Sequence, residues 1–477
     1  MARNGFRVWL VRAAVALGVF CALVVMVYGY FCWAGLQVPI NTQTTRALGP
    51  VGADGRIDYA AAIDAAYGAG VTAENNAAVL MLLAVGGTGS SEVSVGELLK
   101  RMGAEGADAG RKALVTTKVW AEGRGVDDGE LDEAIDKAGE TPWSAEQARG
   151  EFERVRAYLE ENREALDLLV EAGKRERFWW PAVRVPGQSL LAARTEPMGG
   201  FRAAARMLAA RAMMRVNDEP GLAVEDALTV IRLGRHLQGG SGLISYLVGT
   251  GMKSVGYQTM EGMLGELPEE LVEKAAEATA GTNGTMALAT VLDVGERYHC
   301  LESVLSIMPT RQGVPMQWGN AMRIINERFD ELVAALKLTD RAQKKAAIEA
   351  MVKRIERKPG FVQMMNGGLL AEIMLPSLAR SAETADRLAT DRALLRVAIE
   401  VVKFERRMGR YPATLAEAGV GEVKDFITGA AVVYQPGEKG FVVYSVGKNG
   451  RDEGGQEEGD ESVPRSQWPD DLAVMVR

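Results

Sequence analysis

The 477-residue chain contains only two histidines and three cysteines. His236 and His299 cannot supply a three-histidine metal site, and they leave little of the acid–base chemistry that enzymes use near neutral pH. Cys21 and Cys32 lie in an apolar run close to the N-terminus, and Cys300 stands alone. These positions exclude a disulfide framework and a CxxC metal knuckle.

The motifs of the large enzyme classes are also missing. No GxSxG elbow, no GxxxxGK[ST] phosphate loop, no HExxH zinc motif and no GxGxxG loop after a strand occurs. Positive charge is not in excess, because the formal net charge is −8. A general nucleic-acid-binding face would need the opposite balance, so we expect no nucleic-acid partner.

Two pairs of side chains, close together in the sequence, are candidates for a catalytic role. His299 directly precedes Cys300, but adjacent side chains on a helix diverge by about 100°, which favours an ordinary helical segment over a nucleophile pair. Asp293 and Glu296 could instead supply two carboxylates to a cleft, as in a hydrolase. The sequence leaves that alternative open.

One apolar run is long enough to cross a membrane. It extends from Ala13 to Trp33 without a charge, and about 21 residues at 1.5 Å each span the roughly 30 Å of hydrocarbon. Three arginines precede it, so the positive-inside rule keeps the N-terminus in the cytoplasm. We expect residues 1–36 to form a single-pass signal anchor in the inner membrane, with the bulk of the chain on the non-cytoplasmic side. A cleaved signal peptide is the alternative.

The next part of the chain predicts a helical ectodomain. Residues 37–55 are polar and contain Gly and Pro, which is typical of a linker. Residues 56–375 show apolar positions at helical spacing, separated by short breaks and without a fixed repeat. We expect an irregular helical array. Within it, Thr141–Gly173 predicts one helix that begins with a capping box of Ser144 and Gln147.

A run of arginines in the helix predicted over Phe201–Val216 has two interpretations. The first is a basic face in contact with water, and the second is a face that docks on a partner or on a membrane surface. The residues concerned are Arg202, Arg206, Arg211 and Arg215.

The last hundred residues change pattern. Residues 376–408 predict one long helix with an apolar seam. Ala430–Gln435 and Phe441–Val446 predict two strands around a PGEKG turn, and residues 471–477 predict a further strand. The predicted fold is therefore mainly α: an N-terminal transmembrane helix, an irregular helical array, and a small α+β module of residues 376–477, in which a long helix accompanies a short antiparallel sheet.

Acidic residues gather in the loop that follows the second predicted strand. Calcium binds six to eight oxygens, commonly from carboxylates on flexible loops. A calcium site and a solvated acidic loop are both open interpretations of this composition. The residues are Asp452, Glu453, Glu457, Glu458, Asp460 and Glu461, followed by Asp470 and Asp471.

Motifs of this module resemble the periplasmic domain of the major pseudopilin of type II secretion. They are GRYP (409–412) after the long helix, TLAEAG (414–419), the short sheet and YSVGKNGRDEGG (444–455), in which the serine and glycines Ser445, Gly447, Gly450, Gly454 and Gly455 match the family's loop. The family's loop binds calcium through an aspartate and a later acidic residue. The resemblance implies a metal site of Asn449, at the position of that aspartate, with Asp470 or Asp471 as the later acid and Asp452 beside them.

The chain departs from that family elsewhere. The family's Phe-Thr-x-x-x-Glu entry into the N-terminal helix is absent, and DFITG (425–429) stands before the hairpin. Pilin processing and polymerisation are therefore not implied. The helical array resembles uncharacterised bacterial envelope proteins, which implies no activity.

These observations together predict a non-catalytic, membrane-anchored envelope scaffold or adaptor. We expect its terminal module to contact protein partners in the envelope, with calcium as the candidate cofactor. An envelope hydrolase that uses carboxylates of the helical array is the alternative.

Overall fold

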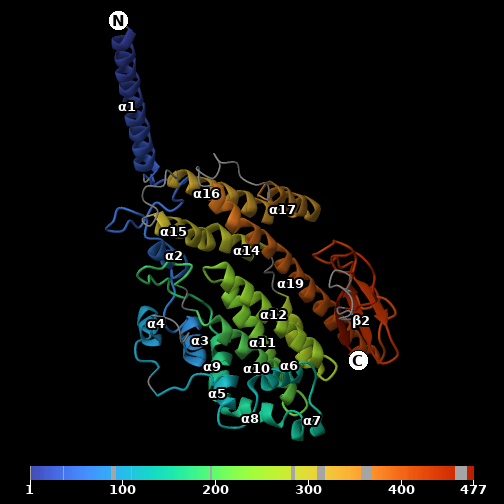
Figure 1. Ribbon diagram of the computed structural model, residues 1–477. Coiled ribbons are helices and arrows are strands. Elements are labelled where there is room, and N and C mark those ends of the chain that lie inside the picture. The colour runs from blue at the N-terminus through green and yellow to red at the C-terminus, as the bar shows by residue number, and fades with distance from the viewer. Residues whose placement is uncertain are drawn as a thin grey trace.

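The computed structural model describes residues 2–35, 37–87, 93–108, 110–193, 196–280, 285–308, 317–355, 368–456 and 470–476. Over these ranges the chain is mainly helical, with one small antiparallel sheet near the C-terminus, which confirms the predicted class. Figure 1 shows α1 (Ala2–Gly35) projecting from the body as a single helix. Within the described residues, Arg12–Tyr30 of α1 is the one stretch long and apolar enough to cross a membrane, and none of it is buried.

Short helices with side-chain caps form the first part of the body. Six of them have an N-cap side chain that accepts a backbone N–H of the first turn, as Asn76 accepts from Ala78. Their sequences therefore fix where they begin. The helices of this part are α2 (Tyr59–Tyr67), α3 (Ala77–Val85), α4 (Val95–Arg101), α5 (Thr117–Ala121), α6 (Asp128–Ala138), α7 (Ala145–Arg149), α8 (Glu153–Glu161) and α9 (Arg163–Gly173).

The predicted capping box of Ser144 and Gln147 is confirmed, but the single helix predicted over Thr141–Gly173 is wrong. The chain breaks at Gly150 and again at Asn162. The buried Asn162 amide accepts the backbone N–H of Val115 at 2.7 Å. A contact with a distant segment therefore decides the second break, and local periodicity does not reveal it.

Three longer helices form the centre of the body: α10 (Met198–Arg215), α11 (Pro220–Gln238) and α12 (Leu243–Met263). The backbones of α11 and α12 touch, because a Cβ atom at Gly234 would lie 2.6 Å from the carbonyl oxygen of Gly249. Of the two interpretations of the α10 arginines, a basic face in contact with water does not hold for Arg211. Its guanidinium is buried and pairs with Asp226 of α11 at 2.6 Å.

The remaining helices lead to the long helix α19 (Gly368–Met408), which begins earlier than predicted. Figure 1 shows α19 running obliquely from the α16 end of the body to the sheet, and it packs on α12, α13, α16 and α17 along the way. The intervening elements are α13 (Glu269–Thr279), α14 (Thr285–Val291), the π-helical turn η1 (Leu292–Glu296), α15 (Arg297–Ile307), α16 (Trp318–Leu336) and α17 (Arg341–Ile355).

The segment predicted as a linker, residues 37–55, packs on the body. Thr44, Thr45 and Ala47 are buried. The side-chain amide of Asn326, on α16, donates to the backbone oxygens of Gln43 at 3.0 Å and Thr44 at 2.8 Å. The chain that leaves α1 is therefore held on the body.

The sheet has the strand order β1 (Val433–Pro436), β2 (Phe441–Ser445) and β3 (Leu472–Val476), and both pairings are antiparallel. Phe441 and Val443 of β2 and Val474 of β3 belong to one apolar core with residues of α11, α12, α13 and α19. The predicted α+β module and the helical array thus share a core. Because Ser445 pairs with Leu472, the loop after β2 lies against the residues that enter β3.

Candidate metal centre at the end of the sheet

A buried carboxylate holds the end of β2. Asp425 accepts hydrogen bonds from the backbone N–H groups of Ile427, Thr428 and Gly429, and from the hydroxyls of Thr428 and Ser445, the last at 3.0 Å. Burial alone would raise the pKa of Asp425, but these hydrogen bonds lower it. The DFITG segment therefore fixes the position from which the acidic loop starts.

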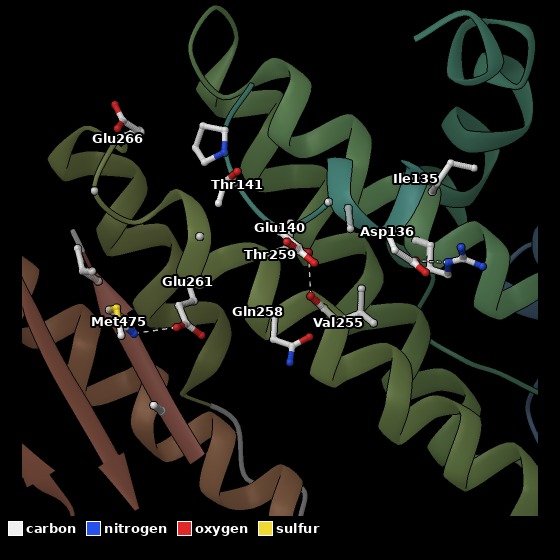
Figure 2. A pocket seen from close by; sticks show the side chains of 18 residues that line it. Ile135, Asp136, Glu140, Thr141, Val255, Gln258, Thr259, Glu261, Glu266 and Met475 are labelled. Carbon is white, nitrogen blue, oxygen red and sulfur yellow. Dashed lines mark hydrogen bonds and ion pairs between the residues drawn. The ribbon is translucent and has the colours of Figure 1, made fainter. Parts of the chain in front are cut away.

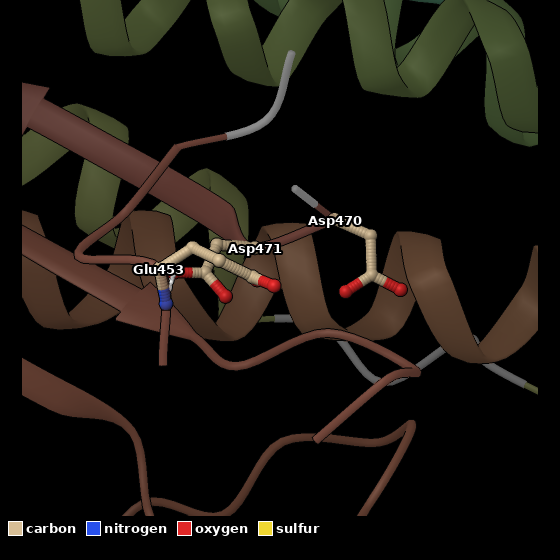
Figure 3. A group of neighbouring side chains, drawn as sticks. All are labelled: Glu453, Asp470 and Asp471. Carbon is tan, nitrogen blue, oxygen red and sulfur yellow. Dashed lines mark hydrogen bonds between the residues drawn. The ribbon is translucent and has the colours of Figure 1, made fainter. Parts of the chain in front are cut away.

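Three further carboxylates meet where this loop lies against the start of β3: Glu453, Asp470 and Asp471 (Figure 3). Backbone N–H groups hold one oxygen of each aspartate. Asp470 Oδ2 accepts from Lys448 at 3.0 Å and Asn449 at 3.1 Å. Asp471 Oδ2 accepts from the backbone N–H groups of Glu453 at 3.1 Å and Gly455 at 2.8 Å. The loop backbone thus fixes the orientation of both side chains.

The second oxygen of each carboxylate is buried and has no hydrogen-bond partner among the residues that the structure describes: Glu453 Oε2, Asp470 Oδ1 and Asp471 Oδ1. Asp471 as a whole is fully buried. Burial and the neighbouring Glu453 raise the pKa of Asp471. Buried, unpaired carboxylate oxygens are unfavourable unless a cation or a proton satisfies them.

The spacing of these carboxylates suits a hard cation. One oxygen from each of the three residues lies within 4.8 Å of the others. Calcium binds oxygens at 2.3–2.6 Å, so oxygens on opposite sides of one ion are about 5 Å apart. Three carboxylates would supply part of its coordination shell, and solvent or backbone oxygens would complete it. The residues present therefore fit a calcium ion.

Of the four metal ligands predicted from the sequence, two lie in the carboxylate cluster and two lie outside it. Asp470 and Asp471 lie in the cluster. Asn449 lies beside it, and its amide donates to Glu453 Oε1 at 2.8 Å. Asp452 instead accepts the hydroxyl of Tyr444 at 2.8 Å. The predicted acids over 457–461 lie outside the described residues.

Sequence reasoning included Glu453 in the acidic loop but not among the ligands. The adjacent Asp452 and Glu453 make different contacts: Asp452 accepts the hydroxyl of Tyr444, whereas Glu453 lies in the cluster. No local pattern in the sequence distinguishes these two acids.

The carboxylates of the hydrolase alternative hold helices together. Glu296 is buried, and its Oε2 accepts the backbone N–H of Leu243, the first residue of α12, at 2.7 Å. Asp293 accepts from Arg297 at 2.8 Å. Neither carboxylate lines the cavities of about 1010, 760 and 260 Å³ that described residues bound.

A different set of carboxylates lines a cavity of about 1010 Å³ between residues 52–58, residues 184–192 and α15. The set is Asp54, Asp58 and Glu302. Glu302 is buried, accepts the backbone N–H of Leu190 at 2.8 Å, and has its pKa raised by burial. Arg184 contacts both Glu302, at 3.5 Å, and Asp58, at 3.1 Å.

A second cavity, of about 760 Å³, separates the α6–α7 connection from α12 and β3. Figure 2 shows Glu261 reaching from α12 to the edge of β3, where it accepts the backbone N–H of Met475 at 2.9 Å. Glu140 and Glu266 also line this cavity. The contact joins the last strand to the centre of the helical array.

No family model, no curated protein and no solved structure matches this chain.

Proposed function

We propose that the protein is a single-pass, membrane-anchored scaffold or adaptor whose terminal module binds calcium and contacts protein partners. In this proposal α1 spans the inner membrane, and the helical array and the sheet lie on the non-cytoplasmic side. The resemblance of the last hundred residues to a pseudopilin periplasmic domain supports this assignment, as does the long apolar stretch of α1.

The carboxylate cluster is the observation that carries the proposal. A cation bound by Glu453, Asp470 and Asp471 would link the loop after β2 to the start of β3. That link would fix the surface of the loop for a partner. Calcium would supply positive charge and coordination only, and the ligand set provides no reaction of its own.

Calorimetric titration of the full chain in detergent with CaCl₂ tests the metal site. We expect Asp471→Asn to abolish binding, because it removes one anionic ligand and keeps the shape of the side chain. Asp452→Asn is the matched control, since its carboxylate contacts Tyr444 and lies outside the cluster. Calcium binding that survives Asp471→Asn and is lost in Asp452→Asn would contradict the assignment.

Chemical cross-linking in membranes tests the adaptor role. We expect the full chain to give cross-linked products in calcium that are lost with a chelator and in Asp471→Asn, whereas Asp452→Asn retains them. Products that are the same with and without calcium would contradict a calcium-dependent contact, although they would leave the metal site itself intact.

The cavity lined by Glu302 favours a second candidate function, an envelope hydrolase. The raised pKa of Glu302 suits a proton donor, and Asp58 could act as a second carboxylate in the same cavity. The full chain would then hydrolyse nitrophenyl glycosides or esters, and Glu302→Gln would abolish turnover without changing the helical content. An inactive wild-type chain across such substrates would exclude this candidate for those substrate classes.

A further inference from the structure

A third cavity, of about 260 Å³, lies where α19 meets α11, α12 and α13. The described part of its lining is rich in positive charge and contains a single carboxylate. The ionisable residues of the lining are Arg232, Arg235, Lys253, Tyr257, Glu277 and Arg392. The apolar side chains of Leu228 and Ile231 form another part of its wall. This cavity is separate from the carboxylate cluster and from the cavity lined by Glu302.

Lys253 is the unusual residue of this cavity, because only 4% of it is exposed. Its aliphatic stem lies against α11, where a Cβ atom at Gly234 would come within 2.7 Å of Lys253 Cγ. Its ammonium donates to the neutral amide oxygen of Gln238 at 3.1 Å. Within the described part of the chain, no carboxylate lies at ion-pair distance from it. Buried charges in proteins are ordinarily paired, so this site has an uncompensated cation.

Lys344 provides a direct comparison in the same body. It is 7% exposed, and its ammonium pairs with Asp386 at 2.8 Å. The fold thus supplies a carboxylate to one buried lysine and an uncharged amide to the other. The charge of Lys344 is therefore neutralised inside the protein, and the charge of Lys253 is not.

The neighbouring charges increase the positive potential at Lys253. Arg232 is neutralised by Glu225 at 2.6 Å, but Arg235 makes no ion pair with a described residue. The pKa of Lys253 falls to about 8, first because of burial and then because of the positive charges of Arg392 and Arg235. Glu277 is the one acid among the described lining residues.

We propose that this cavity binds a small soluble ligand through a phosphate monoester group. Lys253 and Arg235 would donate to the phosphate oxygens, with the Tyr257 hydroxyl at the same wall. Guanidinium and ammonium groups together favour a compact dianion such as phosphate. The volume is below the 300–1,000 Å³ typical of drug-sized ligands, so it admits a phosphate with a short organic part against Leu228 and Ile231.

Titration calorimetry of the full chain in detergent tests this site. The probes are inorganic phosphate and glycerol 3-phosphate, in phosphate-free buffer with ionic strength held constant by chloride. We expect both to bind, and Lys253→Met to raise Kd by about 10- to 100-fold, the effect of one charge-assisted hydrogen bond. Lys344→Met is the matched control and should leave Kd unchanged if it folds. Arg235→Gln, at an exposed position of α11, should weaken binding by several fold without disturbing the fold.

Three results would overturn the proposal: no binding of either probe by the wild-type chain, an unchanged Kd in both Lys253→Met and Arg235→Gln, or an equal loss in a folded Lys344→Met. A phospholipid headgroup would be a different source of the same chemistry. The titration is therefore repeated in nanodiscs with and without phosphatidylglycerol. A Kd for phosphate that is independent of the lipid supports a soluble ligand, and a Kd raised by phosphatidylglycerol would assign the cavity to a lipid instead.

Discussion

Replacement of Lys253 by methionine should change how the stability of the protein depends on pH. In the fold, the pKa of Lys253 is about 8, against an ordinary value of 10.5. Each pKa unit between folded and unfolded protein corresponds to about 1.4 kcal/mol. The buried ammonium therefore destabilises the wild-type chain by about 3 kcal/mol when both states are protonated. The groups around it are Gln238 and Arg235 of α11, Glu277 of α13 and Arg392 of α19.

The sign follows from proton binding. Between pH 8 and 10.5 the unfolded chain binds more protons at Lys253 than the folded chain, so wild-type stability gains a rising contribution in this window. The methionine variant has no such contribution. At pH 7 it lacks the buried charge but also loses the hydrogen bond to Gln238, which offsets about 1 kcal/mol of the gain.

The assay is urea unfolding of both chains at intervals from pH 7 to 10. We expect the stability of Lys253→Met relative to wild type to be greatest at pH 7 and to decrease by roughly 2–3 kcal/mol at pH 10. Other titrating groups, including the tyrosines, are common to both chains and cancel in the difference. A difference that stays constant across this range would refute the account of Lys253 as a buried, uncompensated cation.

Three further substitutions test the packing around the sites by chemical unfolding. A Cβ atom at Gly447 (φ 64°) would overlap Asp470, so Gly447→Ala should cost clearly more than the roughly 1 kcal/mol of backbone strain expected for Gly450→Ala (φ 67°), which has open space; equal losses would contradict the contact. Arg211→Met removes two hydrogen bonds to the buried carboxylate of Asp226, which keeps its contact with Arg215 at 3.2 Å, and should cost about 2–4 kcal/mol; a loss below 1 kcal/mol would show that solvent reaches the site. Asn76→Ala removes the α3 cap and two hydrogen bonds to the backbone of Trp179, a loss of about 2–4 kcal/mol, and a neutral result would show that water replaces the amide.

Local sequence patterns predicted the parts of the fold that depend on neighbouring residues. The capping box of Ser144 and the strand that begins at Phe441 follow from short-range patterns, and the structure contains both of them. The break between helices at Asn162 was not predicted. It depends on a distant segment, because the side-chain amide of Asn162 binds the backbone of Val115.

The candidate sites show the same division. An acidic loop near the C-terminus was evident from composition, but composition does not show that Glu453 joins the cluster while Asp452 binds the hydroxyl of Tyr444. The cavity lined by Lys253 had no signature in the sequence. Lys253 and Arg392 belong to helices that are far apart in the chain, and only the packing of α19 on α12 brings them to one cavity.

The apolar core that β2 and β3 share with α11, α12, α13 and α19 makes the terminal strands part of a single cooperative unit. An ion that binds at the end of the sheet would therefore raise the free energy of unfolding of the whole core, by about 2.7 kcal/mol at an ion concentration one hundred times Kd. Deleting the strands would expose apolar surface of α19 and α12, the helices on which β2 and β3 pack. The terminal strands therefore cover part of the core of the helical body, and their loss would destabilise that core as a whole.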